Sequence, residues 1–238
     1  MLRLYLLPMA TMDEGMPIPA YLIRTDEGKN ILVDTGFSPE MAAAALAPGY
    51  QGPPVHDFIS VVDHLAALGI RPEEVDMLVA THLDPDHAGL TDALPNAEIV
   101  IQRVQLAAAR AEAHPRFGLT RAHWDAPKLR YRQIDGDTKL VPGVTLIATG
   151  GHVPGHQSVL VRLPQTGPVL LAIDAVTSAG QADPETRARR PVDLDDAAAR
   201  ESARKLRDLA AREGVTLTIY GHDKAQWQTL KLAPEYYD

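Results

Sequence analysis

The 238-residue sequence predicts an α+β fold in which two β-sheets are flanked by helices. Short apolar runs of strand length recur throughout the chain, which predicts many strands. Segments with apolar residues at helical spacing lie between these runs in the first part of the chain, and a long amphipathic segment follows them in the second part. This combination favours sheets covered by helices over a helix bundle or a sandwich of sheets alone.

The first part of the chain is predicted to begin with strands. The residues MLRLYLLPMA at 1–10 are expected to form the first strand, and the turn Asp26-Glu27-Gly28 between two apolar runs predicts a hairpin. The strands expected next are 19–25, 30–34, 76–81 and 97–101. The helices expected in this part are 39–47, 57–68, 102–113 and a short one that begins at His87.

Residues 114–138 contain prolines and glycines that interrupt any periodic pattern, and we expect an irregular connection there. This connection divides a single domain, 1–238, into two halves at 1–125 and 126–238. The second half is expected to contain four strands, an amphipathic helix with an aspartate at its N-terminus, and a final strand. These elements are predicted at 138–141, 143–149, 157–163, 168–174, 194–213 and 215–220.

The composition excludes several classes of function. The 23 Lys and Arg residues are outnumbered by 31 Asp and Glu residues, and the formal net charge of -8 disfavours nucleic-acid and anionic membrane partners. The chain has no cysteine, so a metal site must use histidine and carboxylate ligands. No apolar stretch is long enough to span a membrane, and the N-terminal segment lacks a convincing signal cleavage site, so we expect a cytoplasmic protein.

Histidines and aspartates follow several of the predicted strands. In the extended segment after the strand at 76–81, His82, Asp84 and Asp86 share one face because strand side chains alternate. His87 begins the next helix and turns a fourth side chain toward the same space. Two further histidines also follow predicted strands, His152 and His222. The pattern predicts a site for two metals, and the alternative is a solvated acidic loop, because Asp-Pro-Asp is also a common turn composition.

Several segments resemble, in type and order, the motifs of metallo-β-lactamase-fold hydrolases, and most closely those of the N-acyl homoserine lactonases. The segments that carry the resemblance are LVDTG at 32–36, THLDPDHAG at 81–89, GGHVPGHQS at 150–158, LLAIDA at 170–175 and IYGHD at 219–223. The resemblance implies a four-layer αβ/βα sandwich. It also implies a quorum-quenching enzyme that opens the ring of N-acyl homoserine lactones by attack of a metal-bound hydroxide.

The same resemblance implies roles for individual residues. The residues expected at the first metal are His82, His152 and Asp84, the last at a position where the family usually has a histidine. The residues expected at the second metal are Asp86, His87 and His222, with Asp174 bridging both metals. Asp34 and His156 are expected to support these ligands through hydrogen bonds.

Two positions depart from the family pattern. Asp84 places a carboxylate where an imidazole is usual, which lowers the net charge of a two-metal site by one. Zinc is the expected metal, and the additional oxygen ligand also allows manganese, iron or cobalt. Alternatively, Asp84 stays off the metal and one metal site is weak. Thr177 stands where the lactonases usually have a tyrosine that polarises the substrate carbonyl. We expect Thr177 and Asp86, the proton donor that the resemblance implies for the leaving alkoxide, to be the catalytic residues.

Other reactions stay open on sequence alone. The same two-metal site could hydrolyse another lactone, an ester or a thioester, and a carboxylate at the position of Asp84 also occurs in iron oxidoreductases of the superfamily. A groove for an acyl chain could be lined by Met9, Met12, Met16 and Ile18, although ordinary core positions are the simpler expectation. The expected partner is a small lactone or ester, and the expected state is a monomer or a homodimer.

Overall fold

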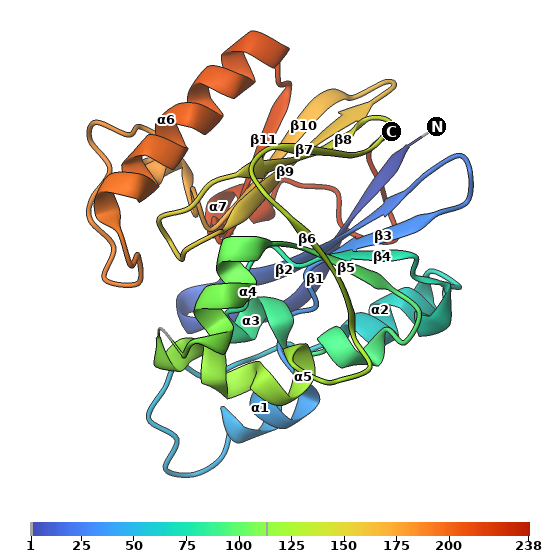
Figure 1. The fold of residues 1–238 in the computed structure, drawn as a ribbon, viewed down its shortest axis with the longest axis vertical. Coiled ribbons are helices and arrows are strands. Elements are labelled where there is room, and N and C mark those ends of the chain that lie inside the picture. The colour runs from blue at the N-terminus through green and yellow to red at the C-terminus, as the bar shows by residue number, and fades with distance from the viewer. Residues whose placement is uncertain (1, 113) are drawn as a thin grey trace.

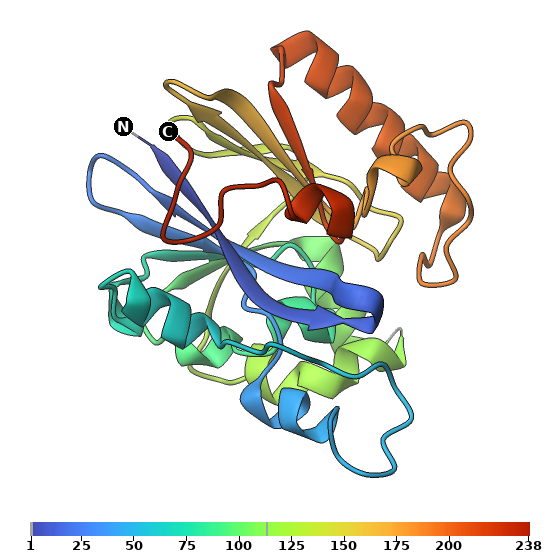
Figure 2. The same cartoon turned by 180° about the vertical axis from the view of Figure 1, so that it is seen from behind.

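The computed structural model describes residues 2–112 and 114–238, and its two β-sheets are stacked face to face between helices (Figure 1). Helix α6 (Asp196–Glu213) covers the outer face of one sheet, and the helices of the first part of the chain cover the outer face of the other (Figure 2). Buried apolar side chains fill the spaces between these four layers. The expected α+β fold with two sheets flanked by helices is confirmed.

The first sheet is mixed, with strand order β1-β2-β3-β4-β5-β6. The pairs from β1 to β3 are antiparallel, and the pairs from β3 to β6 are parallel. Its strands are β1 (Arg3–Met12), β2 (Met16–Arg24), β3 (Asn30–Val33), β4 (Met77–Val79), β5 (Glu98–Gln102) and β6 (Arg130–Ile134). Because strand side chains alternate, Ile31 packs between the two sheets while Leu32 packs toward the outer helices.

The second sheet has the order β11-β10-β9-β8-β7. Its pairs are antiparallel except for β10 and β11, which are parallel. Its strands are β7 (Thr138–Val141), β8 (Val144–Ala148), β9 (Gln157–Leu163), β10 (Gly167–Ile173) and β11 (Leu217–Tyr220). In β10, Leu171 packs between the sheets and Leu170 packs toward α6, so this strand is apolar on both faces.

The helices begin at capping residues that the sequence contains. The side chains of Ser38, Ser60 and Asp195 accept backbone hydrogen bonds at the starts of α1, α2 and α6. Besides α6, the α-helices are α1 (Pro39–Ala44), α2 (Val61–Ala67), α3 (Pro85–Ala88), α4 (Arg103–Arg110), α5 (Arg121–Trp124) and α7 (Lys224–Trp227). The 3-10 helices are η1 (Asp13–Gly15), η2 (Pro72–Glu74), η3 (Thr91–Ala93), η4 (Pro115–Thr120) and η5 (Ala179–Gln181).

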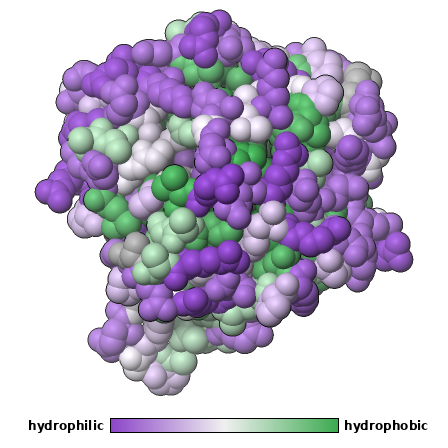
Figure 3. All heavy atoms as spheres, in the orientation of Figure 1, coloured by the Kyte–Doolittle hydropathy of each residue, from purple (hydrophilic) through white to green (hydrophobic). Residues whose placement is uncertain are grey.

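No helix in the described part of the chain is both long and apolar enough to cross a membrane. Hydrophilic side chains cover most of the face seen in Figure 3, with smaller apolar groups between them. The strand predicted at 1–10 begins at Met1, and the helix predicted at 102–113 ends at Ala113. Both of these terminal residues lie outside the described residues.

The connection expected at 114–138 is more ordered than its sequence indicates. It contains η4, α5 and β6, and β6 pairs in parallel with β5 as the last strand of the first sheet. The expectation of an irregular segment was therefore wrong there, because pairing with a strand distant in sequence overrides weak local preference. The change from the first sheet to the second occurs after Ile134, later than the expected division at 125. The short helix α7 was not predicted.

Gly89 joins α3 to the loop that follows β3. Its backbone N–H donates to the carbonyl of Gly36 at 2.8 Å, and a β-carbon at Gly89 would lie 2.4 Å from the backbone nitrogen of Ser38. That distance leaves no room for any side chain, so this contact fixes the loop against α3.

We expect Gly89→Ala to lower the free energy of unfolding by about 1–3 kcal/mol, because the added methyl group must displace backbone rather than a flexible side chain. Chemical denaturation of the metal-free protein measures the change. Gly118→Ala is the matched control, since nothing lies within 4 Å of its β-carbon position. Equal stability of the two variants would contradict the packing argument.

Candidate metal centre

The histidines and aspartates selected from the sequence meet where strands of both sheets end. Asp34 and His82 follow the parallel strands β3 and β4 of the first sheet, directly or within a few residues. Asp174 and His222 follow the parallel strands β10 and β11 of the second sheet in the same way. His152 comes from the loop between β8 and β9. The carboxyl ends of neighbouring parallel strands meet at one edge, so each sheet contributes half of the site.

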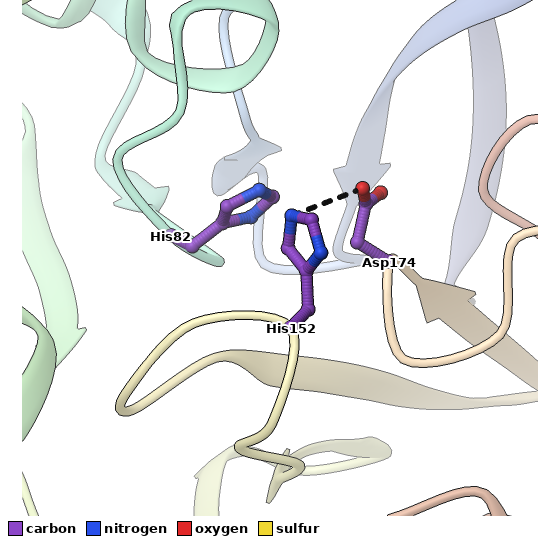
Figure 4. Close-up of side chains that lie close together, drawn as sticks. All are labelled: His82, His152 and Asp174. Carbon is purple, nitrogen blue, oxygen red and sulfur yellow. Dashed lines mark ion pairs between the residues drawn. The ribbon is translucent and has the colours of Figure 1, made fainter. Parts of the chain in front are cut away.

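These side chains form two adjacent clusters. The first contains His82, His152 and Asp174, whose ligand atoms lie within 4.8 Å of one another (Figure 4). The second contains Asp86, His87 and His222, with the same spacing between ligand atoms. Each cluster offers the imidazole nitrogens and carboxylate oxygens that divalent transition metals prefer when thiolates are absent.

Asp174 faces both clusters with different oxygens. Its Oδ2 lies 3.4 Å from Nε2 of His152, and its Oδ1 lies 3.5 Å from Nε2 of His87 and 3.0 Å from Nε2 of His222. The same carboxylate can therefore contact two cations at once, as a bridging ligand would.

Hydrogen bonds fix how each imidazole is oriented. Nδ1 of His87 donates to Asp34, Nδ1 of His152 to Asp193 and Nδ1 of His222 to the carbonyl of Pro17, at 2.8, 3.0 and 2.8 Å. The hydroxyl of Thr81 donates to Asp34, so it accepts from Nδ1 of His82 at 3.0 Å. In all four rings Nδ1 carries the proton that is donated outward, and Nε2 is left to face the clusters.

Several buried atoms of the clusters have no hydrogen-bond partner. Among the described residues these include Nε2 of His82, Nε2 of His87 and Oδ1 of Asp84. Buried polar atoms without partners are costly, and here they converge on the space between the two clusters. The donor set and its unsatisfied atoms both fit divalent cations.

The charges of the clusters stabilise one another. Burial alone would lower the pKa of His152, but Asp174 and the hydrogen bonds to Asp193 and Asp84 raise it to about 9. Burial alone would raise the pKa of Asp174, but the charges of His222 and His152 hold it well below its usual range. The carboxylates are therefore ionised, and protons on His87, His152 and His222 supply the positive charge when no cation is bound.

Asp84 lies beside the first cluster and is paired with an arginine. Its Oδ2 lies 3.0 Å from Nε2 of His152, 3.6 Å from Nε2 of His82 and 2.9 Å from Nη1 of Arg116. Burial would raise the pKa of Asp84, but hydrogen bonds to His152 and His82 hold it far below the usual range. Asp84 is therefore a buried carboxylate anion at the edge of the site.

His156 lies behind the clusters rather than in them. Its Nε2 accepts the backbone N–H of Asp174 at 3.1 Å, and its Nδ1 bonds to the carbonyl and hydroxyl of Thr149. Burial lowers the pKa of His156 well below its usual value, so the ring is neutral. Like Asp34, it holds other site residues in place, which is the supporting position expected from the sequence.

Two residues beside the site have strained backbones. Asp34 has φ of 62° and Ile173 has φ of 51°, in the left-handed region that a β-branched residue rarely adopts. Ile173 lies at the register shift between β10 and β11, directly before Asp174. A β-branched residue in this region costs on the order of 1–3 kcal/mol of folding free energy. The hydrogen bonds of Asp174 hold the strained backbone of Ile173 in place.

Three residues of the second half that hold the clusters in place were not predicted from the sequence. Arg187 has a side chain fully shielded from solvent and donates to Asp193 at 3.1 Å, and Asp193 in turn accepts from His152. Arg190 donates to the carbonyl of Asp174 at 3.2 Å. These residues belong to the polar loop at 179–193, where no periodicity or spacing distinguishes them from solvated charges.

A cavity of about 360 Å³ opens over the clusters. Asp84, Asp86, His152, Asp174 and His222 lie on its polar side. Its apolar side is lined by residues that include Met12, Met16, Phe37, Met41, Val55 and Leu119. Of the four residues expected to line a groove, Met12 and Met16 do so, whereas Met9 and Ile18 are buried in the core.

Thr177 does not lie among the described residues that line this cavity. Its side chain is buried, and its backbone carbonyl accepts the N–H of His222 at 2.9 Å. The catalytic role expected for its hydroxyl stays a prediction without a contact to the cavity. The contact that the structure gives Thr177 is one that positions His222.

The sequence matches the metallo-beta-lactamase superfamily over residues 13–222. The chain belongs to this superfamily. It is 35% identical over 229 residues to an N-acyl homoserine lactonase of Bacillus sp, which covers 93% of this chain and 87% of that protein. It is also 35% identical over 239 residues to N-acyl homoserine lactonase AttM of Rhizobium johnstonii, covering 94% of this chain and 89% of that protein.

A solved structure leads to the same family. An N-acyl homoserine lactone hydrolase with the product N-hexanoyl-L-homoserine bound at its catalytic metal center has a TM-score of 0.86 to this chain, at 29% identity. The match covers 98% of each chain. The expected four-layer metallo-β-lactamase fold and the expected similarity to the N-acyl homoserine lactonases are confirmed.

We expect Asp193→Asn to weaken zinc binding about 10–100-fold, because the amide no longer orients His152 as a carboxylate does. Competition with a chelator of known affinity measures the change. Asp183→Asn changes an exposed aspartate of the same loop and should bind zinc as the unmodified protein does. Unchanged affinity in Asp193→Asn would show that this contact does not matter for metal binding.

Proposed function

We propose that the chain opens the lactone ring of N-acyl homoserine lactones at a site for two divalent metal ions. The observation that carries this proposal is the common orientation of four imidazoles, three of them buried and His222 partly buried. Each donates Nδ1–H away from the site and turns Nε2 toward the carboxylates of Asp86 and Asp174. A ligand set arranged in this way, in a chain of this family, supports metal-dependent hydrolysis.

We propose the ligands as follows. His82, His152 and Asp174 hold one cation, with Asp84 beside it, and Asp86, His87, His222 and Asp174 hold the other. When bound, the two cations would lower the pKa of a water molecule and polarise the substrate carbonyl. Zinc is the proposed metal, and the carboxylate of Asp84 leaves manganese, iron or cobalt as candidates.

The chain itself supplies orientation and proton transfer. Asp86 lines the cavity with a side chain that is 21% exposed. As an ionised carboxylate it can take up the proton that the attacking water loses and pass that proton to the leaving alkoxide. The apolar side of the cavity can hold the acyl chain of the substrate and exclude water from the reacting carbonyl. The site takes residues from both sheets, so we propose that the whole chain acts as one domain. A cytoplasmic location and a monomeric or homodimeric state stay predictions from the sequence.

The first experiment is a substrate panel with metal-stripped protein that is refilled separately with zinc, manganese, iron or cobalt. Ring opening of a lactone releases a proton, so a pH indicator follows every lactone in the panel. We expect turnover of N-acyl homoserine lactones that requires the added metal. Turnover only of simple lactones, esters or thioesters would keep the two-metal hydrolase and reject this substrate. Redox activity of the iron form without hydrolysis would reject hydrolysis itself.

Asp174→Asn tests the shared carboxylate. Because Asp174 faces both clusters, we expect metal-dependent turnover to fall by roughly a thousandfold or more. Asp208→Asn, an exposed position on α6, is the control and should retain turnover. Full activity of the Asp174→Asn variant would contradict the placement of Asp174 between two metals.

A further inference from the structure

Arg116 is an arginine beside the clusters that the proposed reaction does not use. It lies in η4, within the segment whose sequence predicted only an irregular connection, and its side chain is 16% exposed. Nη1 donates to Oδ2 of Asp84 at 2.9 Å, and Nη2 donates to the carbonyl of Val192 at 2.9 Å. It therefore spans from the first half of the chain to the loop at 179–193 of the second half, along the wall of the cavity.

The position of Arg116 follows from the charge of its partner. Asp84 and Asp174 are buried and Asp86 is partly buried beside them, so the site holds three carboxylates where the family pattern has two and an additional imidazole. An extra buried anion lowers the net charge of a site with two divalent cations by one. The guanidinium of Arg116 is always protonated, so it adds the missing positive charge back.

We propose that Arg116 is the built-in counter-cation of Asp84, a positioning residue that restores the net charge of the two-metal site. Arginine suits this task because its two terminal nitrogens bind two acceptors at once, here a carboxylate and a carbonyl. This inference rests on the proposed two-metal function and concerns how strongly the site attracts its metals.

A purely structural role for Arg116 predicts a different result. If Arg116 only ties η4 to the loop at 179–193, its loss would loosen the site and weaken metal binding. If it compensates Asp84, its loss leaves the carboxylate free and the site more negative, so metals bind more tightly. The sign of the change in affinity separates the two roles.

The test measures zinc affinity by chelator competition and zinc content by elemental analysis, at neutral pH. We expect Arg116→Gln to bind zinc at least about tenfold more tightly than the unmodified protein, and Arg116→Lys, which keeps the charge, to bind it nearly as the unmodified protein does. Unchanged or weaker binding in Arg116→Gln, with the metal-free protein still folded, would overturn the proposal.

Two further variants test the proposal if Arg116→Gln alone fails to fold. They are Asp84→Asn and the double variant that combines Asp84→Asn with Arg116→Gln. Asp84→Asn leaves the guanidinium without its anion, and we expect zinc binding at least about tenfold weaker. The double variant restores the original net charge, so its affinity should exceed that of Asp84→Asn by about tenfold. Equal affinity of Asp84→Asn and the double variant would also contradict charge compensation.

Arg200→Gln is the matched control. Arg200 donates to the carbonyls of Pro184 and Arg187, so it anchors the same loop without lying in the cavity. It should leave zinc affinity unchanged, and a change as large as that in Arg116→Gln would assign the effect to the loop. Failure of the unmodified protein to take up zinc or manganese would instead reject the two-metal function itself.

Discussion

The carboxylate of Asp174 is the group on which the rest of the site depends, because it lies between both clusters of histidines. Oδ2 faces His152 and Oδ1 faces His222, at 3.4 and 3.0 Å. The main chain holds this carboxylate in place, since the N–H of Asp174 donates to His156 and its carbonyl accepts from Arg190. The strained turn at Ile173 directs Asp174 away from β10, and these contacts offset the cost of that turn.

Charge balance explains much of what surrounds Asp174. Three carboxylates and four imidazoles share a buried space, and burial disfavours every charge in it. The carboxylates stay ionised beside the imidazoles, and the carboxylates raise the pKa of His87, His152 and His222 despite burial. Burial and the neighbouring His87 lower the pKa of His82, so this imidazole is neutral. A second layer of residues surrounds these groups. Asp34 accepts a hydrogen bond from His87, and Asp193 accepts one from His152. Arg116 donates a hydrogen bond to Asp84. The cavity over this space is also lined by apolar residues.

Local patterns predicted most of the elements of the fold. Apolar runs gave the strands of both sheets to within a few residues, and Ser60 explains why α2 begins at Val61 rather than at 57. The segment at 130–134 was missed because β6 is a short edge strand rich in polar residues, and only its pairing with β5 makes it a strand.

The sequence by itself determined the residue types of the site and their order along the chain, because alternation in His82, Asp84 and Asp86 and the strand-end positions of His152, Asp174 and His222 are local properties. Only the tertiary structure decided which atoms face the metals and which residues support them. Asp193, Arg187 and Arg116 lie in segments without periodicity. Arg187 meets Asp193 within one loop, and Asp193 in turn meets His152 of another loop. Arg116 meets Val192 across the two halves of the chain. The contact of Arg116 depends on how the two halves pack, and those of Arg187 and Asp193 depend on how two loops fold, which no short-range pattern records.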